Sequence, residues 1–151
     1  MPGPTPCKSS GGATLEAAIH LAVEAHTGQL DRNGQPYILH PLRVMFRLRT
    51  EVLQIVGILH DVVEDSPYTF DDLREMGYPE EIIHALDCLT KREGENYEDF
   101  VERSQSDPIA REVKLADLED NMDVRRMPRI TEKEAAKLDR YRQAWEKLRP
   151  S

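Results

Sequence analysis

Residues 51–63, EVLQIVGILHDVV, form the most apolar part of the chain. Apolar side chains occupy nearly every side of this segment, which is typical of a helix buried in the centre of a domain. The apolar stretch is too short to span a bilayer and is interrupted by Gln54 and His60, so we do not expect a membrane helix. The segment therefore predicts the central helix of a folded domain.

Helix signals lie on both sides of this segment. Thr14 is the predicted cap of a first helix that ends near Thr27 and Gly28, and a loop over 28–39 leads to a second helix, which follows His40 directly with Pro41 in its first turn. Thr69-x-x-Asp72 and Thr131-x-x-Glu134 are predicted capping boxes. Apolar periodicity predicts further helices near 80–91, 96–105 and 108–124, and a last helix with its stripe at Leu138, Tyr141, Trp145 and Leu148. No segment alternates as a strand would, so the predicted fold class is all-α.

The composition fits one domain of 151 residues. The 28 acidic residues outnumber the 20 basic ones and give a formal charge of −8, which argues against a nucleic-acid partner. Residues 1–13 are rich in Gly and Pro and are predicted to be a flexible leader, and residues 14–151 form the predicted domain. Cys7 and Cys88 imply no disulfide framework, and the N-terminus has no apolar signal core. We therefore expect a cytoplasmic protein without a membrane partner; the sequence is silent on its oligomeric state.

Polar residues interrupt the segment that should be core. Burying His60 and Asp61 costs several kcal/mol unless they are paired or bind a metal. If the helix continues, Glu64 and Asp65 lie one turn further on the same side, and a bound cation would relieve the repulsion among the three carboxylates. A buried His60–Asp61 hydrogen-bonded pair followed by a solvated helix end explains the same string, and both interpretations stay open.

Two other sites carry polar groups beside apolar residues. Asp117 lies at the edge of an apolar stripe, with Asp120 and Asn121 on the same face one turn later, and His40 lies between an apolar run and Pro41. Taken alone, Asp117 is more typical of an exposed acidic helix end, and His40 of a core or capping histidine. Taken together, two imidazoles and two carboxylates suit Mn, Fe, Zn or a similar ion, and contain too much nitrogen for calcium. This predicted ligand set is His40, His60, Asp61 and Asp117.

The order His, His-Asp, Asp resembles that of the HD phosphohydrolase superfamily. Four strings narrow the resemblance: AHTGQLDRNGQPYILHPLRV at 25–44, ILHDVVEDSPYTFDDL at 58–73, LTKREGENYEDF at 89–100 and VKLADLEDNM at 113–122. They resemble the hydrolase domain of RelA/SpoT-type alarmone enzymes, and most of all the free-standing small alarmone hydrolases. The likeness runs from about residue 14 to the end and holds four separate motifs in the expected order.

This resemblance implies an HD-domain helical bundle whose central buried helix carries the His-Asp pair. It implies one Mn²⁺ ion held by the four predicted ligands, and a reaction that removes the 3′-pyrophosphate from guanosine tetra- or pentaphosphate. Glu64 and Asp65 match the pair that acts on the hydrolytic water. Arg32, Asn121 and Tyr141 match residues that contact the substrate, although the periodicity of Tyr141 also fits core packing.

The chain departs from the family at two basic positions. Asp31 stands where the family has an arginine that lies against the guanine, and Leu118 replaces another arginine. An aspartate accepts hydrogen bonds but cannot stack as a guanidinium does. The nucleobase is therefore open, and the adenosine analogues are alternatives, as is another phosphorylated nucleotide such as a nicotinamide dinucleotide phosphate. A non-catalytic nucleotide-sensing HD module is an alternative from a different class. The synthetase half of long family members is not expected in a chain of this length.

Overall fold

The computed structural model of the chain describes residues 12–150, so the predicted leader lies almost wholly outside the described residues. The described part is helical, and its β pairing is limited to one isolated bridge between Leu30 and Pro36. The predicted all-α fold class is confirmed. The helices are α1 (Leu15–His26), α2 (Leu39–Phe46), α3 (Glu51–Leu59), α4 (Val62–Asp65), α5 (Phe70–Glu75), α6 (Glu80–Leu89), α7 (Tyr97–Gln105), α8 (Pro108–Asn121), the short 3₁₀ helix η1 (Val124–Arg126) and α9 (Glu132–Leu148).

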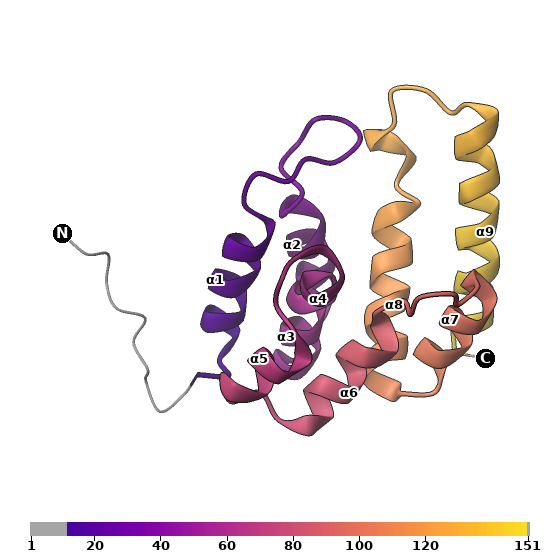
Figure 1. The fold of residues 1–151 in the computed structure, drawn as a ribbon. Coiled ribbons are helices and arrows are strands. Elements are labelled where there is room, and N and C mark those ends of the chain that lie inside the picture. Colours follow the sequence, from indigo (N-terminus) through magenta and orange to yellow (C-terminus); the bar gives the residue numbers. More distant parts are fainter. Residues whose placement is uncertain (1–11, 151) are drawn as a thin grey trace.

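The helix α3 is central, as its apolar sequence predicts. It packs against α1, α2, α6 and α8 and contributes to the larger of two hydrophobic cores. Figure 1 shows α1, α2 and α3 on one side of the molecule and α8 beside α9 on the other. A smaller core joins α7, α8 and α9 through Val101, Leu118, Ala144 and Leu148. The helix α8 contributes to both cores, and so connects the two halves of the bundle.

Side-chain caps fix the starts of the helices. The hydroxyl of Thr14 accepts a hydrogen bond from the amide of Ala17, as predicted. The capping box of Thr69 and Asp72 is complete, with both reciprocal hydrogen bonds present. The box predicted at Thr131 is only half formed: the Thr131 hydroxyl accepts from the amide of Glu134, but the Glu134 carboxylate contacts that hydroxyl instead of the Thr131 amide.

The predicted helix over 51–63 is interrupted at His60 and Asp61. The helix α3 ends at Leu59, and α4 begins at Val62. In an unbroken helix the Gly57 carbonyl would accept from the amide of Asp61, but here it accepts a 2.6 Å hydrogen bond from Nδ1 of His60. Asp61 adopts φ −105° and ψ −1°, close to the bridge region. The prediction that Glu64 and Asp65 lie on the same side as His60 and Asp61 assumed a continuous helix. The helix is interrupted between these residues, so that assumption does not hold.

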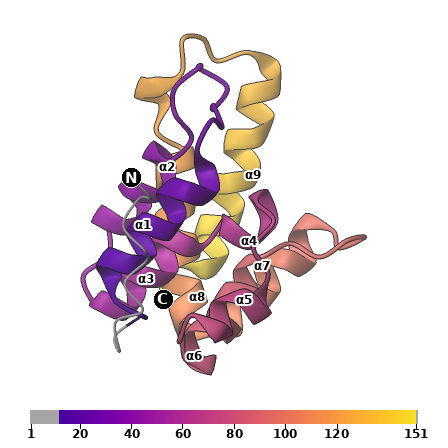
Figure 2. The same ribbon diagram turned by 60° about the vertical axis from the view of Figure 1, so that its left-hand side comes forward.

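Two other boundaries differ from the expected ones. The helix predicted over 108–124 ends at Asn121, and a separate 3₁₀ turn follows because the Asp123 side chain accepts from the amide of Arg125. His40 does not precede the second helix but lies in its first turn, since α2 begins at Leu39. Figure 2 shows the loop before α2 and the segment between α8 and α9 at the same end of the bundle.

Within residues 12–150, no helix combines the length and the apolar character needed to cross a membrane.

Candidate active site

A pocket of about 720 Å³ lies at one end of the bundle. Its walls come from the 27–38 loop, α2, Asp61 between α3 and α4, α8, the segment 123–131 and α9 as far as Tyr141. An amide hydrogen bond of 2.9 Å from Nδ2 of Asn33 to the carbonyl of Arg126 joins the two loops of its rim. Six of the predicted site residues line this pocket: Arg32, His40, Asp61, Asp117, Asn121 and Tyr141. The other three, His60, Glu64 and Asp65, are not part of its lining.

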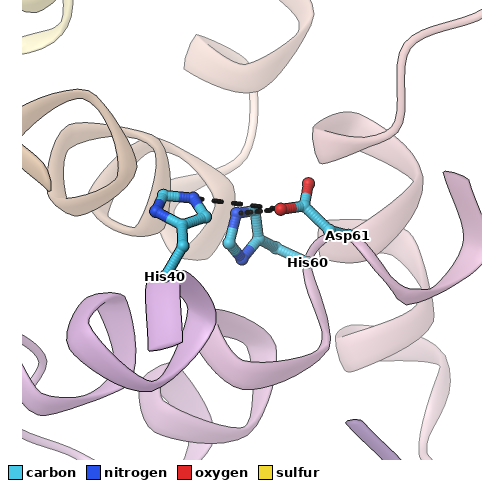
Figure 3. Close-up of side chains that lie close together, drawn as sticks. All are labelled: His40, His60 and Asp61. Carbon is cyan, nitrogen blue, oxygen red and sulfur yellow. Dashed lines mark ion pairs between the residues drawn. The ribbon is translucent and has the colours of Figure 1, made fainter. Parts of the chain in front are cut away.

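The four predicted metal ligands meet beside this pocket. Nε2 of His40 lies 2.9 Å from Oδ1 of Asp117 and 3.9 Å from Oδ2 of Asp61. Nε2 of His60 lies 3.1 Å from that oxygen of Asp61 and 3.4 Å from Oδ1 of Asp117. Figure 3 shows both imidazole rings directed at the Asp61 carboxylate. One donor atom each of His40, His60 and Asp61 lies within 4.8 Å of the others, a spacing that suits a shared ion.

Hydrogen bonds on the far side of each ring direct both Nε2 atoms inward. Nδ1 of His60 donates to the Gly57 carbonyl, and Nδ1 of His40 faces Oδ2 of Asp120 at 2.6 Å. Nε2 of His60 is buried and has no hydrogen-bond partner of acceptable geometry, despite its carboxylate neighbours. A buried polar atom without a partner is costly. The donor set and this free nitrogen fit a divalent metal ion.

Opposite charges hold the cluster together in the protein alone. Burial by itself would lower the pKa of His60, but the carboxylates of Asp61 and Asp117 raise that pKa well above its usual range. Burial likewise lowers the pKa of His40, and hydrogen bonds to Asp117 and Asp120 outweigh it and raise that pKa. A metal ion binds only neutral imidazole, so metal and protons compete for these rings.

Asp61 and Asp117 stay ionised in this environment. Burial raises the pKa of Asp117, but Lys114 and the two histidines lower it well below its usual range. Nζ of Lys114 lies 3.1 Å from Oδ2 of Asp117, and Tyr37 donates a hydrogen bond of 2.5 Å to Oδ2 of Asp61. These contacts fix the direction of both carboxylates.

The predicted catalytic pair lies on α4, next to Asp61. One oxygen each of Asp61, Glu64 and Asp65 lies within 4.8 Å of the others. Burial and the charge of Asp61 raise the pKa of Glu64, and the same two causes raise the pKa of Asp65. Oε1 of Glu64 accepts a hydrogen bond from the amide of Lys91 at 3.1 Å. A carboxylate with a raised pKa is a better proton acceptor near neutral pH.

The three predicted substrate-binding residues reach the pocket from different elements. Arg32 is an exposed residue of the 27–38 loop, Asn121 ends α8, and Tyr141 lies on α9. Nδ2 of Asn121 donates to Oδ1 of Asp117 at 3.1 Å, so this side chain contacts a predicted metal ligand. Tyr141 packs against the smaller core and lines the pocket, so the two interpretations of this residue are compatible.

Asp31, which departs from the family pattern, has a structural contact in the loop. Its Oδ1 accepts hydrogen bonds from the amides of Asn33 and Gln35, at 2.8 and 2.9 Å. This carboxylate therefore shapes the turn that presents Arg32.

Sequence reasoning assigned no role in the site to several residues around the predicted ligands. Tyr37, Lys114 and Asp120 each contact one of them directly, and Arg43 and Arg126 contact Asp120. Helical periodicity could have indicated two of these residues, because Lys114 lies three residues before Asp117 and Asp120 lies three residues after it. No pattern in the sequence marks the contact of Arg43 with α8, because it joins residues far apart in the chain.

Comparisons with known proteins show relatives for most of this chain. No protein-family model matches it. It is 34% identical over 121 residues to a probable GTP pyrophosphokinase of Mycobacterium leprae, a match of 72% of this chain and 15% of that protein. It is 29% identical over 120 residues to the guanosine-3′,5′-bis(diphosphate) 3′-pyrophosphohydrolase of Aquifex aeolicus, covering 72% of this chain and 17% of the relative. The chain thus spans less than a fifth of these curated relatives.

A solved structure shares the fold. It is that of a metazoan ortholog of SpoT, described as hydrolysing ppGpp and acting in starvation responses. The TM-score is 0.74 at 21% identity, and the match covers 89% of this chain and 85% of the other.

Proposed function

Because this chain belongs to the RelA/SpoT-type HD hydrolase family, we propose that it is a metal-dependent hydrolase of nucleotides that carry a 3′-pyrophosphate. The substrates are alarmones of the guanosine tetra- and pentaphosphate type or their adenosine analogues, and the products are pyrophosphate and a nucleotide with a free 3′-hydroxyl. One observation carries the proposal: the donor atoms of His40, His60, Asp61 and Asp117 converge beside a large pocket.

These four residues would hold one divalent ion, and we propose Mn²⁺. When bound, such an ion polarises phosphoryl oxygens and makes the attacking water more acidic. Glu64 is the proposed general base, and it takes the proton of that water at its carboxylate, assisted by Asp65. The raised pKa of Glu64 supports this role. Tyr37 donates a hydrogen bond to Asp61 and so helps to keep this ligand side chain in place.

The cationic side chains of the pocket could bind a polyanionic substrate. Five of them line it, Arg32, Arg43, Arg126, Arg129 and Lys137, together with the carboxylates of Asp31, Asp61, Asp117, Asp123 and Glu134. Guanidinium groups pair well with phosphate oxygens, so an acidic protein can accept this ligand. The proposed contacts are Arg32 with phosphate, Asn121 with the ribose and Tyr141 with the body of the nucleotide. Oδ1 of Asp31 accepts hydrogen bonds from two loop amides, so only Oδ2 is free to accept one from the base. The choice between guanine and adenine is therefore tested directly.

Pyrophosphate release by the Mn²⁺-loaded protein tests the proposal. The panel compares guanosine and adenosine nucleotides with a 3′-pyrophosphate, and includes a nicotinamide dinucleotide phosphate assayed for phosphate. We expect pyrophosphate from at least one of the first two. Asp61→Ala should lose metal and turnover together, and Glu64→Gln should keep metal and lose turnover, whereas exposed Glu75→Gln should match the wild type. Release of phosphate from the dinucleotide alone would contradict the proposed substrate class.

Metal binding and nucleotide binding without turnover would contradict catalysis and favour the sensing module. We also propose that the enzyme acts in the cytoplasm on a small-molecule substrate, with no nucleic-acid or membrane partner. The family relationship and the acidic composition support this.

A further inference from the structure

Asp120 is a buried carboxylate to which the proposed mechanism assigns no contact with substrate. Its side chain has no solvent exposure. Its Oδ2 lies 2.6 Å from Nδ1 of His40, and its Oδ1 accepts hydrogen bonds from Nε of Arg43 at 2.8 Å and Nη1 of Arg126 at 3.2 Å. The Asp120 carbonyl accepts a further 2.7 Å hydrogen bond from Arg126. One carboxylate therefore joins α2, α8 and η1.

These contacts connect two parts of the pocket. His40 presents Nε2 to Asp61 and Asp117, whereas Arg43 and Arg126 line the adjoining pocket. Without Asp120, the two guanidinium groups would lack their shared buried counter-charge. They would also be free to turn toward the Asp117 side of the pocket or into solvent.

The contact with His40 determines which ring nitrogen can bind a metal. A carboxylate only accepts hydrogen bonds, so Nδ1 of His40 carries the proton. A neutral ring then has its lone pair on Nε2, which faces the other predicted ligands. Such outer carboxylates fix the tautomer and direction of metal-binding histidines, and changing them typically lowers metal affinity by about 10–100-fold.

We propose that Asp120 is a positioning residue that holds His40 with Nε2 directed at the metal site and fastens Arg43 and Arg126 in the adjoining wall. The inference rests on the metal site of the proposed function. It adds a residue that affects metal binding through His40 and anion binding through the two arginines. The same substitution should therefore weaken metal binding and anion binding together.

Titration of the metal-free protein with Mn²⁺, followed by calorimetry, tests the first part. Asp120→Asn should bind Mn²⁺ about 10–100-fold more weakly than the wild type. Glu119→Gln is the matched control, because it removes the same charge from the next residue of α8, where the side chain is exposed and bonds Trp145 instead. This control should change the affinity less than about threefold.

The two proposals can fail separately. A wild-type protein that binds no Mn²⁺ overturns the metal site and the proposed function. A wild-type protein that binds Mn²⁺, with equal affinity in Asp120→Asn, overturns the role of Asp120 alone.

Nitrogen-15 NMR of the histidine rings supplies a readout that a loss of general stability would not move. In the wild-type protein, loaded with diamagnetic Zn²⁺, we expect a strongly downfield Nδ1–H proton for His40, as a short hydrogen bond to a carboxylate produces. That signal should move upfield in Asp120→Asn and stay in Glu119→Gln. Absence of the downfield signal from the wild type overturns the inference even if the variant fails to fold.

Inorganic pyrophosphate, added to the metal-free protein, tests the arginine half. Its affinity should fall several-fold in Asp120→Asn and remain unchanged in Glu119→Gln. Equal pyrophosphate affinity in all three proteins overturns the proposed effect on Arg43 and Arg126.

Discussion

At the scale of single residues, the predicted ligands depend on charged partners that are themselves buried. Lys114 is 7% exposed, and its ammonium group lies between the Asp117 carboxylate and the face of the Phe100 ring, 4.7 Å from the ring centre. Burial lowers the pKa of Lys114, but Asp117 and the other negative neighbours outweigh it and raise that pKa. The pair therefore stays charged. Removal of either member would leave the other as a buried charge without this partner.

Replacement of this ammonium group should destabilise the protein. Lys114→Met leaves the buried Asp117 carboxylate with only the two histidines as cationic partners, and should reduce the free energy of unfolding of the metal-free protein by about 3 kcal/mol. Mn²⁺ should restore part of that loss, because it supplies positive charge to the same carboxylate. Urea unfolding with and without Mn²⁺ measures both effects. Lys133→Met, at an exposed position of α9, should stay within about 0.5 kcal/mol of the wild type; equal losses in the two variants would contradict this account.

Asp120 should contribute a pH-dependent part of the stability. Burial raises its pKa, but hydrogen bonds to His40 and Arg43 outweigh this and lower the pKa to about 2. A depressed pKa stabilises the folded state above the unfolded value of 3.8, and this stabilisation is lost as the pH falls toward the folded value. The nearby charges are those of His40, Arg43, Arg47 and Arg126.

In the metal-free protein, Asp120→Asn should therefore be less stable than the wild type by about 2 kcal/mol at pH 5. The difference should shrink steadily between pH 4 and pH 2. Urea unfolding across this range measures it. Glu119→Gln should show no such trend, and a gap that stays constant down to pH 2 would show that Asp120 acts by shape and not by charge.

At the scale of elements, the close packing of α2 against α3 sets the separation of the two histidines. A side chain at Gly57 would place its Cβ 2.7 Å from Cδ1 of Leu48 and 3.5 Å from Cα of Met45. Leu48 would have to move to admit this Cβ, and a larger side chain would also press on the backbone of α2. The same glycine offers its carbonyl to Nδ1 of His60, so it also orients this ring.

A branched side chain at this contact should separate the two helices. Gly57→Val should lower the free energy of unfolding by about 2 kcal/mol, as overpacking of a core does, and should weaken Mn²⁺ binding as well. Chemical denaturation and metal titration measure the two effects. The comparison is Ala136→Val on the exposed face of α9, which should lose less than about 1 kcal/mol and bind metal normally. Normal metal binding by Gly57→Val would show that the histidines tolerate a shift of α3.

The sequence predicts most of these elements because caps and apolar periodicity are local signals. The Thr69 capping box and the central apolar segment are examples, and both are present in the structure. The break at His60 is not local in this sense. It depends on the imidazole of His60, which donates to the Gly57 carbonyl and faces the Asp117 carboxylate of α8. Periodicity cannot detect a bond that only the tertiary fold makes available.

The same distinction applies to the site. The motifs place His40, His60, Asp61 and Asp117 in order, and the structure brings these four together. Their roles as ligands stay a prediction. The contacts of Tyr37 and Asp120 could not be read from spacing, because Asp120 lies 80 residues from His40 in the chain.

At the scale of the whole molecule, the predicted ligands connect helices from both halves of the bundle. His40 lies on α2, His60 and Asp61 separate α3 from α4, and Asp117 lies on α8. An ion bound by all four would link these elements in the folded state only. Such binding stabilises the fold by about 2.7 kcal/mol when the free ion is at 100 times its dissociation constant.

Mn²⁺ at that concentration should therefore raise the melting temperature by about 5–10 °C, and a chelator should reverse the rise. Differential scanning calorimetry measures the shift. His60→Gln should melt at nearly the same temperature with and without Mn²⁺. A full shift in this variant would place the stabilising ion somewhere else on the protein.

The sequence separation of the ligands has a consequence for the order in which the site forms during translation. His40 and Asp117 are 77 residues apart. At the usual speed of a ribosome, about 5–20 residues per second, the two histidines and Asp61 are made several seconds before α8. The nascent chain has no Lys114–Asp117 pair and no Asp120 during this interval. Asp117 and Asp120 are thus the last carboxylates added to the predicted site, and we expect metal binding to follow completion of α8.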